Sequence, residues 1–192
     1  MALRVTGGIL GGRIIRVPKT AVRPTQDRVR AAVFSSLAER IPGARVLDLF
    51  AGSGAIGLEA YSRGAASVCW VESDRRVLVV LNDNIRQLCG PGAAAGLKPE
   101  TRVVAADVLK FVQQRRESES FDLIFADPPY DHDGGWLKKI LFALGMGSML
   151  NAKGLLVMEV SARVPESVLA HWPWVKTKIY GETRICMLPR IV

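Results

Sequence analysis

The tetrapeptide Asp-Pro-Pro-Tyr at residues 127–130 carries the most specific chemistry in this sequence. Each proline lacks an N–H group and restricts the residue before it, so the segment is stiff and offers carbonyl acceptors rather than donors. The carboxylate of Asp127 and a neighbouring carbonyl suit an amino group that has two N–H bonds to donate. Holding both hydrogens would direct the nitrogen lone pair toward an electrophile, while Tyr130 can stack on a planar base. The alternative is a proline turn that ends a strand, which would leave an acid and an aromatic residue unexplained.

A glycine-rich segment at residues 51–54 is the second chemical feature. It lies between an apolar run at 45–49 and a helix-forming stretch that begins near Ala55. The pattern Gly52-x-Gly54-x-x-Gly57 matches the fingerprint of nucleotide-binding loops that join a strand to a helix. A Lys-Ser or Lys-Thr pair does not follow, which disfavours an ATP P-loop. The segment predicts a cofactor that contains adenosine, and a purely structural strand-to-helix turn is the alternative.

Acidic residues occur at or just after the ends of successive apolar runs: Asp48, Glu72, Asp107 and Asp127. Ligands of an open α/β sheet bind beyond the carboxyl ends of its strands, so these side chains should meet at one edge. Glu72 follows the glycine loop at about the 20-residue spacing of acids that bind ribose hydroxyls. Asp107 can accept from the adenine amine, and Asp48 can order the glycine turn and face an ammonium group of the cofactor. Capping of the helices that follow is the alternative role for Glu72 and Asp107.

Strand and helix patterns alternate through most of the chain. Strands are predicted over 45–49, 67–72, 102–106, 121–126 and 154–160, and helices over 54–63, 74–88, 107–116, 136–144 and 165–170. This order predicts a doubly wound, mainly parallel α/β sheet. Two further alternating runs, 175–180 and 183–188, flank a Gly-Glu pair and predict a closing antiparallel hairpin. The expected fold is therefore a seven-stranded Rossmann-like sheet that ends in an antiparallel hairpin.

The first 24 residues are predicted to form a separate, basic extension. Two short strands, 4–6 and 13–17, should form a hairpin with one basic and one apolar face. Thr25 is expected to cap a helix that runs to about Arg40, with Arg28 and Arg30 off its buried stripe. We therefore expect a hairpin extension over residues 1–24 and one catalytic domain over residues 25–192.

The net charge of +8 arises from 26 Lys and Arg residues against 18 Asp and Glu residues, and most of the excess lies in the first 40 residues. A basic end on a near-neutral domain favours a nucleic-acid partner, although a solvated cationic surface is the alternative. Three widely spaced cysteines argue against a disulfide framework or a zinc site. The sequence contains no apolar stretch long enough to span a membrane and no recognisable signal peptide, so we expect a cytoplasmic protein.

Together, these motifs resemble the RsmD family, which methylates N2 of a guanine in bacterial 16S ribosomal RNA with S-adenosylmethionine. The resemblance rests on residues 47–54, 127–130, an Arg-Pro-Thr-Gln-Asp-Arg-Val-Arg segment at 23–30, and Tyr-Gly-Glu-Thr-Arg at 180–184. It implies a direct in-line methyl transfer without a metal or a covalent intermediate. The catalytic residues that it implies are Asp127, Pro128, Pro129 and Tyr130, with the first two holding the amine and Tyr130 stacking on a flipped base.

The resemblance also implies two binding sets. The cofactor would be bound by Asp48, Phe50, Ala51, Gly52, Ser53, Gly54, Glu72, Ser73, Asp107, Val108 and Asp127. Together with the charge excess, it places RNA contacts at Arg13, Arg16, Arg23, Thr25, Arg28 and Arg30. The expected partner is small-subunit ribosomal RNA, naked or in an assembly intermediate with ribosomal proteins, and the enzyme is expected to be a monomer.

Other functions remain open at this point. An adenine-N6 or cytosine-N4 DNA methyltransferase could use the same Asp-Pro-Pro-Tyr segment, but the chain leaves little room for a sequence-reading domain. An NAD-dependent oxidoreductase would leave that segment unexplained, and a non-catalytic RNA-binding protein would not need acids at the strand ends. His132 is interpreted as a solvated loop residue and Trp136 as a packing residue.

Overall fold

The computed structural model describes residues 3–18, 27–90, 99–114, 119–129, 131–145, 149–169 and 176–190. Within this part of the chain, none of the helices combines the length and apolar character needed to cross a membrane.

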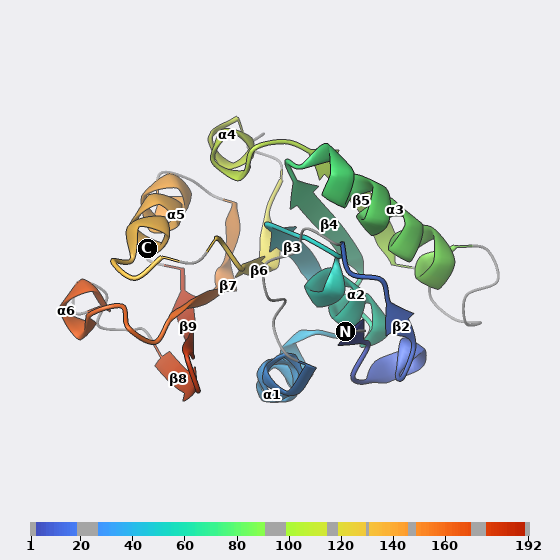
Figure 1. The fold of residues 1–192 in the computed structure, drawn as a ribbon, viewed down its shortest axis with the longest axis horizontal. Helices are drawn as coiled ribbons and strands as arrows, with labels where there is room; N and C mark the ends of the chain where they lie inside the picture. Colours follow the sequence, from blue (N-terminus) through green and yellow to red (C-terminus); the bar gives the residue numbers. More distant parts are fainter. Residues whose placement is uncertain are drawn as a thin grey trace.

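A seven-stranded sheet forms the centre of the described structure, with the strand order β5-β4-β3-β6-β7-β9-β8 (Figure 1). The strands are β3 (Arg45–Leu49), β4 (Ser67–Glu72), β5 (Glu100–Ala105), β6 (Phe121–Ala126), β7 (Leu150–Ser161), β8 (Lys176–Tyr180) and β9 (Thr183–Pro189). The first five are parallel to one another, whereas β9 is antiparallel to both β7 and β8. The predicted doubly wound sheet with a closing antiparallel hairpin is confirmed.

Helices cover both faces of this sheet. They are α1 (Asp27–Ser36), α2 (Ala55–Ser62), α3 (Arg75–Cys89), α4 (Val108–Gln113), α5 (Gly135–Gly145) and α6 (Glu166–Leu169). Side chains alternate along the central strand β3, so Val46 packs with α1, α2 and α3, whereas Leu47 and Leu49 pack with α4 and α5. Figure 1 shows these two groups of helices on opposite sides of the sheet. The buried strands therefore have apolar residues on both faces, which explains their continuous apolar runs.

The N-terminal extension is a small antiparallel pair, β1 (Leu3–Arg4) and β2 (Ile14–Ile15), with the short 3-10 helix η1 (Gly8–Leu10) between the strands. Both strands are shorter than predicted, and the backbone N–H and carbonyl of Arg16, just after β2, bond to the side chain of Asn84 instead of a strand. The extension lies against α2, and a Cβ on Gly8 would lie 1.9 Å from the carbonyl oxygen of Ser62. Ile15 is buried, but Ile14 is 51% exposed, so the face expected to be basic also carries an apolar residue.

Helix α1 ends earlier than predicted. Leu37 leaves the helical region with φ −108° and ψ 9°, and the short 3-10 helix η2 (Ala38–Arg40) follows. The hydroxyl of Ser36 donates to the carbonyl oxygen of Val33 over 2.7 Å, a local bond that competes with the helical pattern. Phe34 stacks on Phe125 of β6 with ring centroids 5.2 Å apart, which fixes α1 against the strand that leads to Asp127. The predicted N-cap, Thr25, lies outside the described residues.

Candidate active site

Parallel pairing brings the predicted acids to one edge of the sheet. Asp48 in β3 is in register with Trp70 of β4 and Phe125 of β6, so the next residues along these strands reach the same edge. Asp48 is buried, and its carboxylate accepts a hydrogen bond from the backbone N–H of Gly57 over 2.9 Å. Burial raises the pKa of this carboxyl well above its ordinary value. The hydrogen bond from the Gly57 N–H lowers the pKa, whereas the negative charges of Asp127 and Glu72 raise it further. Three acids from three strands therefore form one electrostatic cluster.

The glycine loop has backbone conformations that explain its composition. Gly52 and Gly54 have φ values of 55° and 81°, in the left-handed region that glycine adopts at little cost. Gly54 precedes α2 directly, and a Cβ on Gly57 would lie only 2.1 Å from Nε1 of Trp70. The first two glycines therefore make the turn, and the third allows α2 to approach β4 closely.

Phe50 enters this turn with a φ of 60°, an unusual value for a bulky side chain. Its ring meets Trp136 edge-on, with centroids 5.1 Å apart. Trp136 lies in the first turn of α5, shortly after the Asp-Pro-Pro segment, so the aromatic pair joins the glycine loop to the segment after β6. The interpretation of Trp136 as a packing residue agrees with this contact, and its place between the two loops was not foreseen.

Glu72 organises the backbone around the glycine loop. One carboxylate oxygen accepts from the N–H of Gly52 over 2.9 Å, and the other accepts from the N–H groups of Ser73 and Asp74 over 2.7 and 2.8 Å. Asp74, rather than Glu72, is the N-cap of α3. A carboxylate has about four acceptor positions, so Glu72 retains capacity for a ligand hydroxyl.

Asp107 has the capping role that was its alternative. It is the N-cap of α4 and accepts from the N–H of Lys110 over 3.0 Å, while its side chain is exposed at the same sheet edge. Val108 is 4% exposed and belongs to the core, so its side chain offers little surface to a ligand. A cofactor contact by Val108 would therefore have to use its backbone.

The Asp-Pro-Pro segment leaves β6 at the centre of this edge. Asp127 is half-buried, Pro128 is buried and Pro129 is exposed, whereas Tyr130 lies outside the described residues. The next turn is held by Asp131, whose carboxylate accepts from the N–H of Gly134 over 3.2 Å and from the N–H of Trp136 over 2.8 Å.

The side chain of His132 is exposed, as expected for a loop residue, yet its Nδ1 lies 3.1 Å from Oγ of Ser161 at the end of β7. The segment after β6 is therefore also fastened to the next strand of the sheet.

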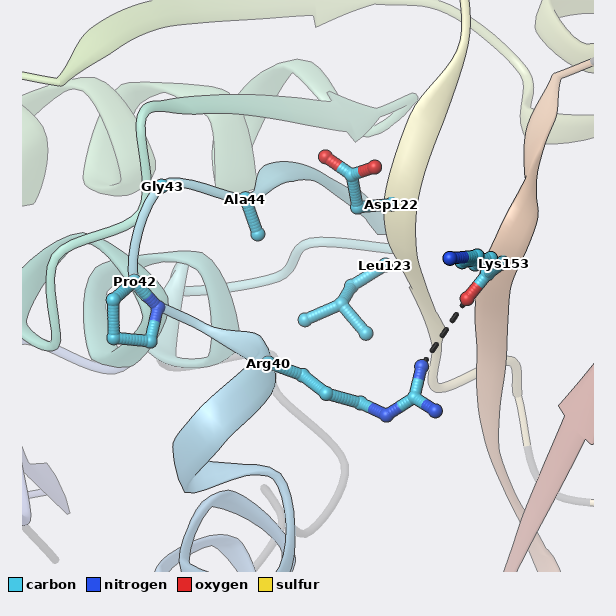
Figure 2. A pocket seen from close by; sticks show the side chains of 7 residues that line it. All are labelled: Arg40, Pro42, Gly43, Ala44, Asp122, Leu123 and Lys153. Carbon is cyan, nitrogen blue, oxygen red and sulfur yellow. Dashed lines mark hydrogen bonds between the residues drawn. The ribbon is translucent and has the colours of Figure 1, made fainter.

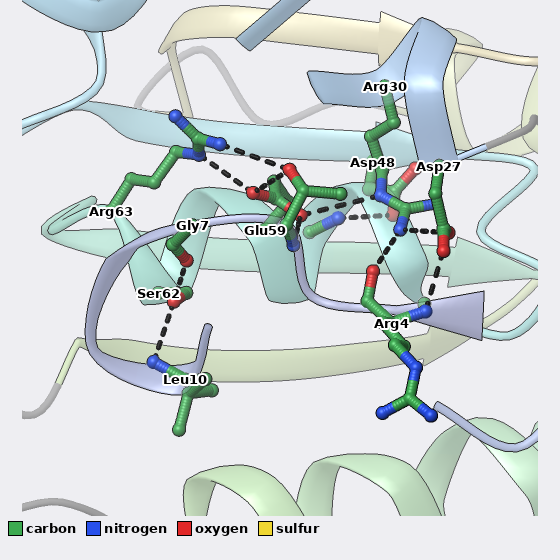
Figure 3. Close-up of polar contacts among 12 residues, drawn as sticks. Arg4, Gly7, Leu10, Asp27, Arg30, Asp48, Glu59, Ser62 and Arg63 are labelled. Carbon is green, nitrogen blue, oxygen red and sulfur yellow. Dashed lines mark hydrogen bonds and ion pairs between the residues drawn. The ribbon is translucent and has the colours of Figure 1, made fainter. Parts of the chain in front are cut away.

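The predicted RNA contacts divide into exposed and buried residues. Arg13, Arg16 and Arg28 are exposed, and Arg23 lies outside the described residues, as does Thr25. Arg30 is 2% exposed, so its prediction as a phosphate contact is wrong. Its guanidinium pairs with Asp27 at 2.7 Å and with Glu59 of α2 at 3.4 Å, and it donates to the carbonyl of Arg4 (Figure 3).

Glu59 is a buried acid outside the set of predicted site residues. It has no exposed side-chain surface, and it accepts from the backbone and hydroxyl of Thr6, each over 2.7 Å, and from Arg63 over 2.8 Å. Figure 3 shows Arg30 and Arg63 converging on it from α1 and from the end of α2. Its signal in the sequence was an acid within the apolar face of a helix.

Asn84 is a second buried polar residue that was not predicted as part of the site. It lies on the buried stripe of α3 with Leu81 and Leu88, where an apolar side chain is expected. Its amide contacts the carbonyl oxygen of Ser53 in the glycine loop over 2.9 Å.

A hollow of about 240 Å³ lies at the opposite end of the sheet and does not belong to this site. Figure 2 shows Arg40 at its rim, where Nη1 donates to the carbonyl oxygen of Lys153 over 3.2 Å. Its lining includes Ala44 and Asp122, next to the amino ends of β3 and β6. Ligands of open α/β sheets bind at the other edge, where the acids converge.

Known proteins resemble this chain over almost its whole length. Residues 3–189 match the family described as Conserved hypothetical protein 95. The chain is 36% identical over 183 residues to the ribosomal RNA small subunit methyltransferase D of Escherichia coli (strain K12), which covers 94% of this chain and 86% of that protein. The solved structure of a hypothetical protein from Thermus thermophilus has a TM-score of 0.79 and 32% identity, over 97% of this chain and 99% of that one.

A more distant structure extends the comparison of folds. The T. thermophilus 16S rRNA N2 G1207 methyltransferase, solved with AdoMet and guanosine, has a TM-score of 0.72 at 20% identity. The match covers 100% of this chain and 50% of that one.

The sheet order and the relatives of at least 30% identity define a methyltransferase with a Rossmann-like fold. Within that class, the chain belongs to the family described as Conserved hypothetical protein 95, and its predicted resemblance to RsmD-like enzymes is confirmed.

Proposed function

We propose that this protein transfers a methyl group from S-adenosylmethionine to the N2 amine of a guanine in small-subunit ribosomal RNA. The observation that carries the proposal is the position of the Asp-Pro-Pro segment. This segment follows β6, which pairs with β3. The negative charge of Asp127 raises the pKa of the buried carboxyl of Asp48, which lies next to the glycine loop. An acceptor for an amine thus lies next to the predicted cofactor loop.

The residues present fit the cofactor. Bound S-adenosylmethionine supplies a methyl group on a positively charged sulfonium, which is already an activated electrophile. The acidic cluster of Asp48, Glu72 and Asp127 favours a cationic ligand, because a positive charge offsets the mutual repulsion of the acids. Glu72 would bind the ribose, and the glycine loop admits a close approach of the ligand to the backbone.

Asp127 and the carbonyl of Pro128 would accept the two hydrogens of the target amine. This arrangement orients the nitrogen lone pair and contributes to the rate by positioning. A base that removes a proton before attack is unnecessary, because the proton leaves as positive charge builds on nitrogen. Tyr130 would stack on the extruded base, as base-modifying enzymes require when their target lies in a helix.

Ribosomal RNA is the substrate favoured by the relatives. The curated relative that is 36% identical to this chain is a ribosomal RNA small subunit methyltransferase. The exposed residues Arg13, Arg16 and Arg28 supply positive charge for a phosphate backbone. A cytoplasmic location follows from this substrate.

The test uses purified protein with labelled S-adenosylmethionine and small ribosomal subunits from a strain that lacks the gene. Naked 16S ribosomal RNA from the same strain and duplex DNA are the parallel substrates. Nuclease digestion and mass spectrometry should find the label in N2-methylguanosine. Label in N6-methyladenine or N4-methylcytosine would support the DNA methyltransferase alternative instead. If calorimetry showed that the protein binds NAD but not S-adenosylmethionine, the proposed activity would be refuted.

The role of Asp127 has its own prediction. Asp127→Ala should lower kcat by about 100-fold or more, because the acceptor that orients the target amine is lost. The affinity for S-adenosylhomocysteine, measured by calorimetry, should change by less than about threefold because the glycine loop is intact. The matched control is Asp83→Ala, at an acid on α3 that forms a solvent-exposed pair with Arg86. Turnover within threefold of the unmodified enzyme would show that Asp127 does not hold the amine.

A further inference from the structure

Asn84 uses its whole side-chain amide to join two segments that are far apart in the sequence. Its Nδ2 donates to the carbonyl oxygens of Ser53 and Arg16, each over 2.9 Å. Its Oδ1 accepts from the backbone N–H of Arg16 over 3.0 Å. The residue is 1% exposed, so water does not substitute for these partners. Two donors and one acceptor are thus satisfied by one residue of the N-terminal extension and one of the glycine loop.

The chemistry of this position selects asparagine. A neutral side chain with two N–H donors and one oxygen acceptor is needed to face two carbonyls and one N–H. An aspartate here would set a carboxylate oxygen against two carbonyl oxygens, and a leucine would leave all three backbone groups without a partner. Buried polar groups that lack a partner destabilise the fold. An apolar residue would extend the buried stripe of α3, so the amide is retained against the pattern of its own helix.

The two segments that Asn84 joins have different predicted partners. Ser53 belongs to the glycine loop, on the cofactor side. Arg16 is exposed in the basic extension, on the RNA side. The middle of the extension is fastened to α2, where the N–H of Leu10 in η1 donates to Oγ of Ser62 over 2.8 Å. Asn84 thus contacts both the extension and the loop through the hydrogen bonds of one side-chain amide on α3.

We propose that Asn84 is a positioning residue that holds the basic N-terminal extension in register with the cofactor loop. This inference rests on the proposed function and assigns a specific residue to the alignment of its two substrates. Asn84 itself touches neither substrate. It acts through the backbone of Arg16 and the carbonyl of Ser53, so disturbing one contact should loosen the other.

The sharpest test compares two substitutions of one residue. Arg16→Ala removes the guanidinium but keeps the N–H that Asn84 accepts, whereas Arg16→Pro removes both. Binding of S-adenosylhomocysteine is measured by calorimetry, and binding of 16S ribosomal RNA is measured by filter retention. We expect both variants to bind RNA about threefold or more weakly. Only Arg16→Pro should also weaken the binding of S-adenosylhomocysteine, by about fivefold, which corresponds to roughly 1 kcal/mol.

Asn84→Asp provides the second measurement. It should weaken the binding of both ligands by about tenfold and raise both KM values in the methyl-transfer assay. A tenfold loss of affinity corresponds to about 1.4 kcal/mol, a typical effect of losing one buried hydrogen bond. Thermal melting of each variant monitors folding, and the Arg16 pair keeps the test decisive if Asn84→Asp does not fold. Equal S-adenosylhomocysteine affinities for Arg16→Ala and Arg16→Pro would overturn the positioning role. Failure of the unmodified protein to bind S-adenosylhomocysteine would instead overturn the proposed function.

Discussion

Asp48 is a residue whose buried charge would favour ligand binding while it lowers the stability of the ligand-free protein. Burial raises the pKa of its carboxyl well above the ordinary value, and Asp127 and Glu72 raise it further. The folded protein therefore binds this proton more tightly than the unfolded chain does. The stabilising contribution is full below the unfolded pKa of about 3.9 and is lost as the pH rises through the folded pKa. A cationic ligand beside Asp48 would favour the charged form and reverse part of that loss.

Asp48→Asn should therefore stabilise the ligand-free protein and weaken the binding of the cofactor. The asparagine oxygen can still accept from the N–H of Gly57, and the buried charge is gone. We expect the Tm at pH 8 to rise by about 2–4 °C, equivalent to about 1 kcal/mol for a chain of this size. The rise should be smaller at pH 5, where more of the Asp48 carboxyl is already protonated. Calorimetric scans at the two pH values test this, and equal changes in Tm would contradict the buried charge as the cause.

At the level of elements, the contact between α2 and β4 depends on the absence of a side chain at Gly57. Trp70 has no exposed surface, and its Nε1 lies within 3.4 Å of the carbonyl oxygen of Gly54. A Cβ at position 57 would lie 2.1 Å from the same nitrogen, so the helix and the strand would have to separate. Close packing in protein interiors transmits such a shift to the glycine loop.

We therefore expect Gly57→Ala to lower the free energy of unfolding by about 3 kcal/mol, the upper range for an overpacked core. Gly145→Ala is the matched control, because a Cβ there meets no atom within 4 Å. Urea unfolding followed by tryptophan fluorescence compares the two variants. A Gly57→Ala protein as stable as the control would show that α2 does not need this approach to β4.

The buried ion pairs of Glu59 connect three elements in a similar way. Glu59 and Arg30 have side-chain exposures of 0% and 1%, and the same carboxylate holds Thr6 of the extension. Removing one charge of a buried pair leaves the other without compensation, which costs about 3–5 kcal/mol. Here Asp27 still pairs with Arg30, so the lower end of that range applies.

Glu59→Gln should consequently lower the free energy of unfolding by about 3 kcal/mol. Asp83→Asn, in the exposed pair with Arg86, should change it by less than about 0.5 kcal/mol. Both values come from urea unfolding at pH 7. If the two substitutions cost the same, Glu59 does not fasten α1 and the extension to α2.

For the whole molecule, the positive net charge of +8 favours the proposed binding of RNA. Exposed arginines that contact phosphates release counterions, so each makes the affinity more sensitive to salt. Arg13 and Arg28 are exposed, whereas Arg30 is buried in ion pairs although it is only two residues from Arg28. The effective basic surface is therefore smaller than the arginine count suggests.

Replacing Arg13 or Arg28 by alanine should reduce the slope of log affinity against log salt by about 0.7–0.9. Arg30→Ala should leave that slope unchanged and lower the Tm, because its charge is neutralised inside the fold. Filter binding to 16S ribosomal RNA across a range of KCl concentrations measures the slopes. An equal loss of slope for all three variants would place Arg30 on the RNA surface and contradict its burial.

The sequence by itself determined the sheet and the chemical character of its ligand edge. The predicted strands 45–49, 67–72 and 121–126 coincide with β3, β4 and β6, because buried parallel strands require continuous apolar runs. Since strand ends meet at one edge, the acids that follow these runs could be placed in one site without coordinates. Arginine composition, in contrast, did not reveal which charges reach solvent.

Tertiary structure alone decided how the buried polar residues are used. Arg30 and Glu59 are 29 positions apart and neutralise each other only when α1 packs beside α2. Asn84 gains its role because α3 brings it against Ser53 and Arg16, which lie 31 and 68 positions away. The free energy of a buried charge or amide depends on the partners that packing supplies, and local sequence patterns do not encode those partners. The glycine loop could be read from its own residues, but its connection to the basic extension exists only in the folded chain.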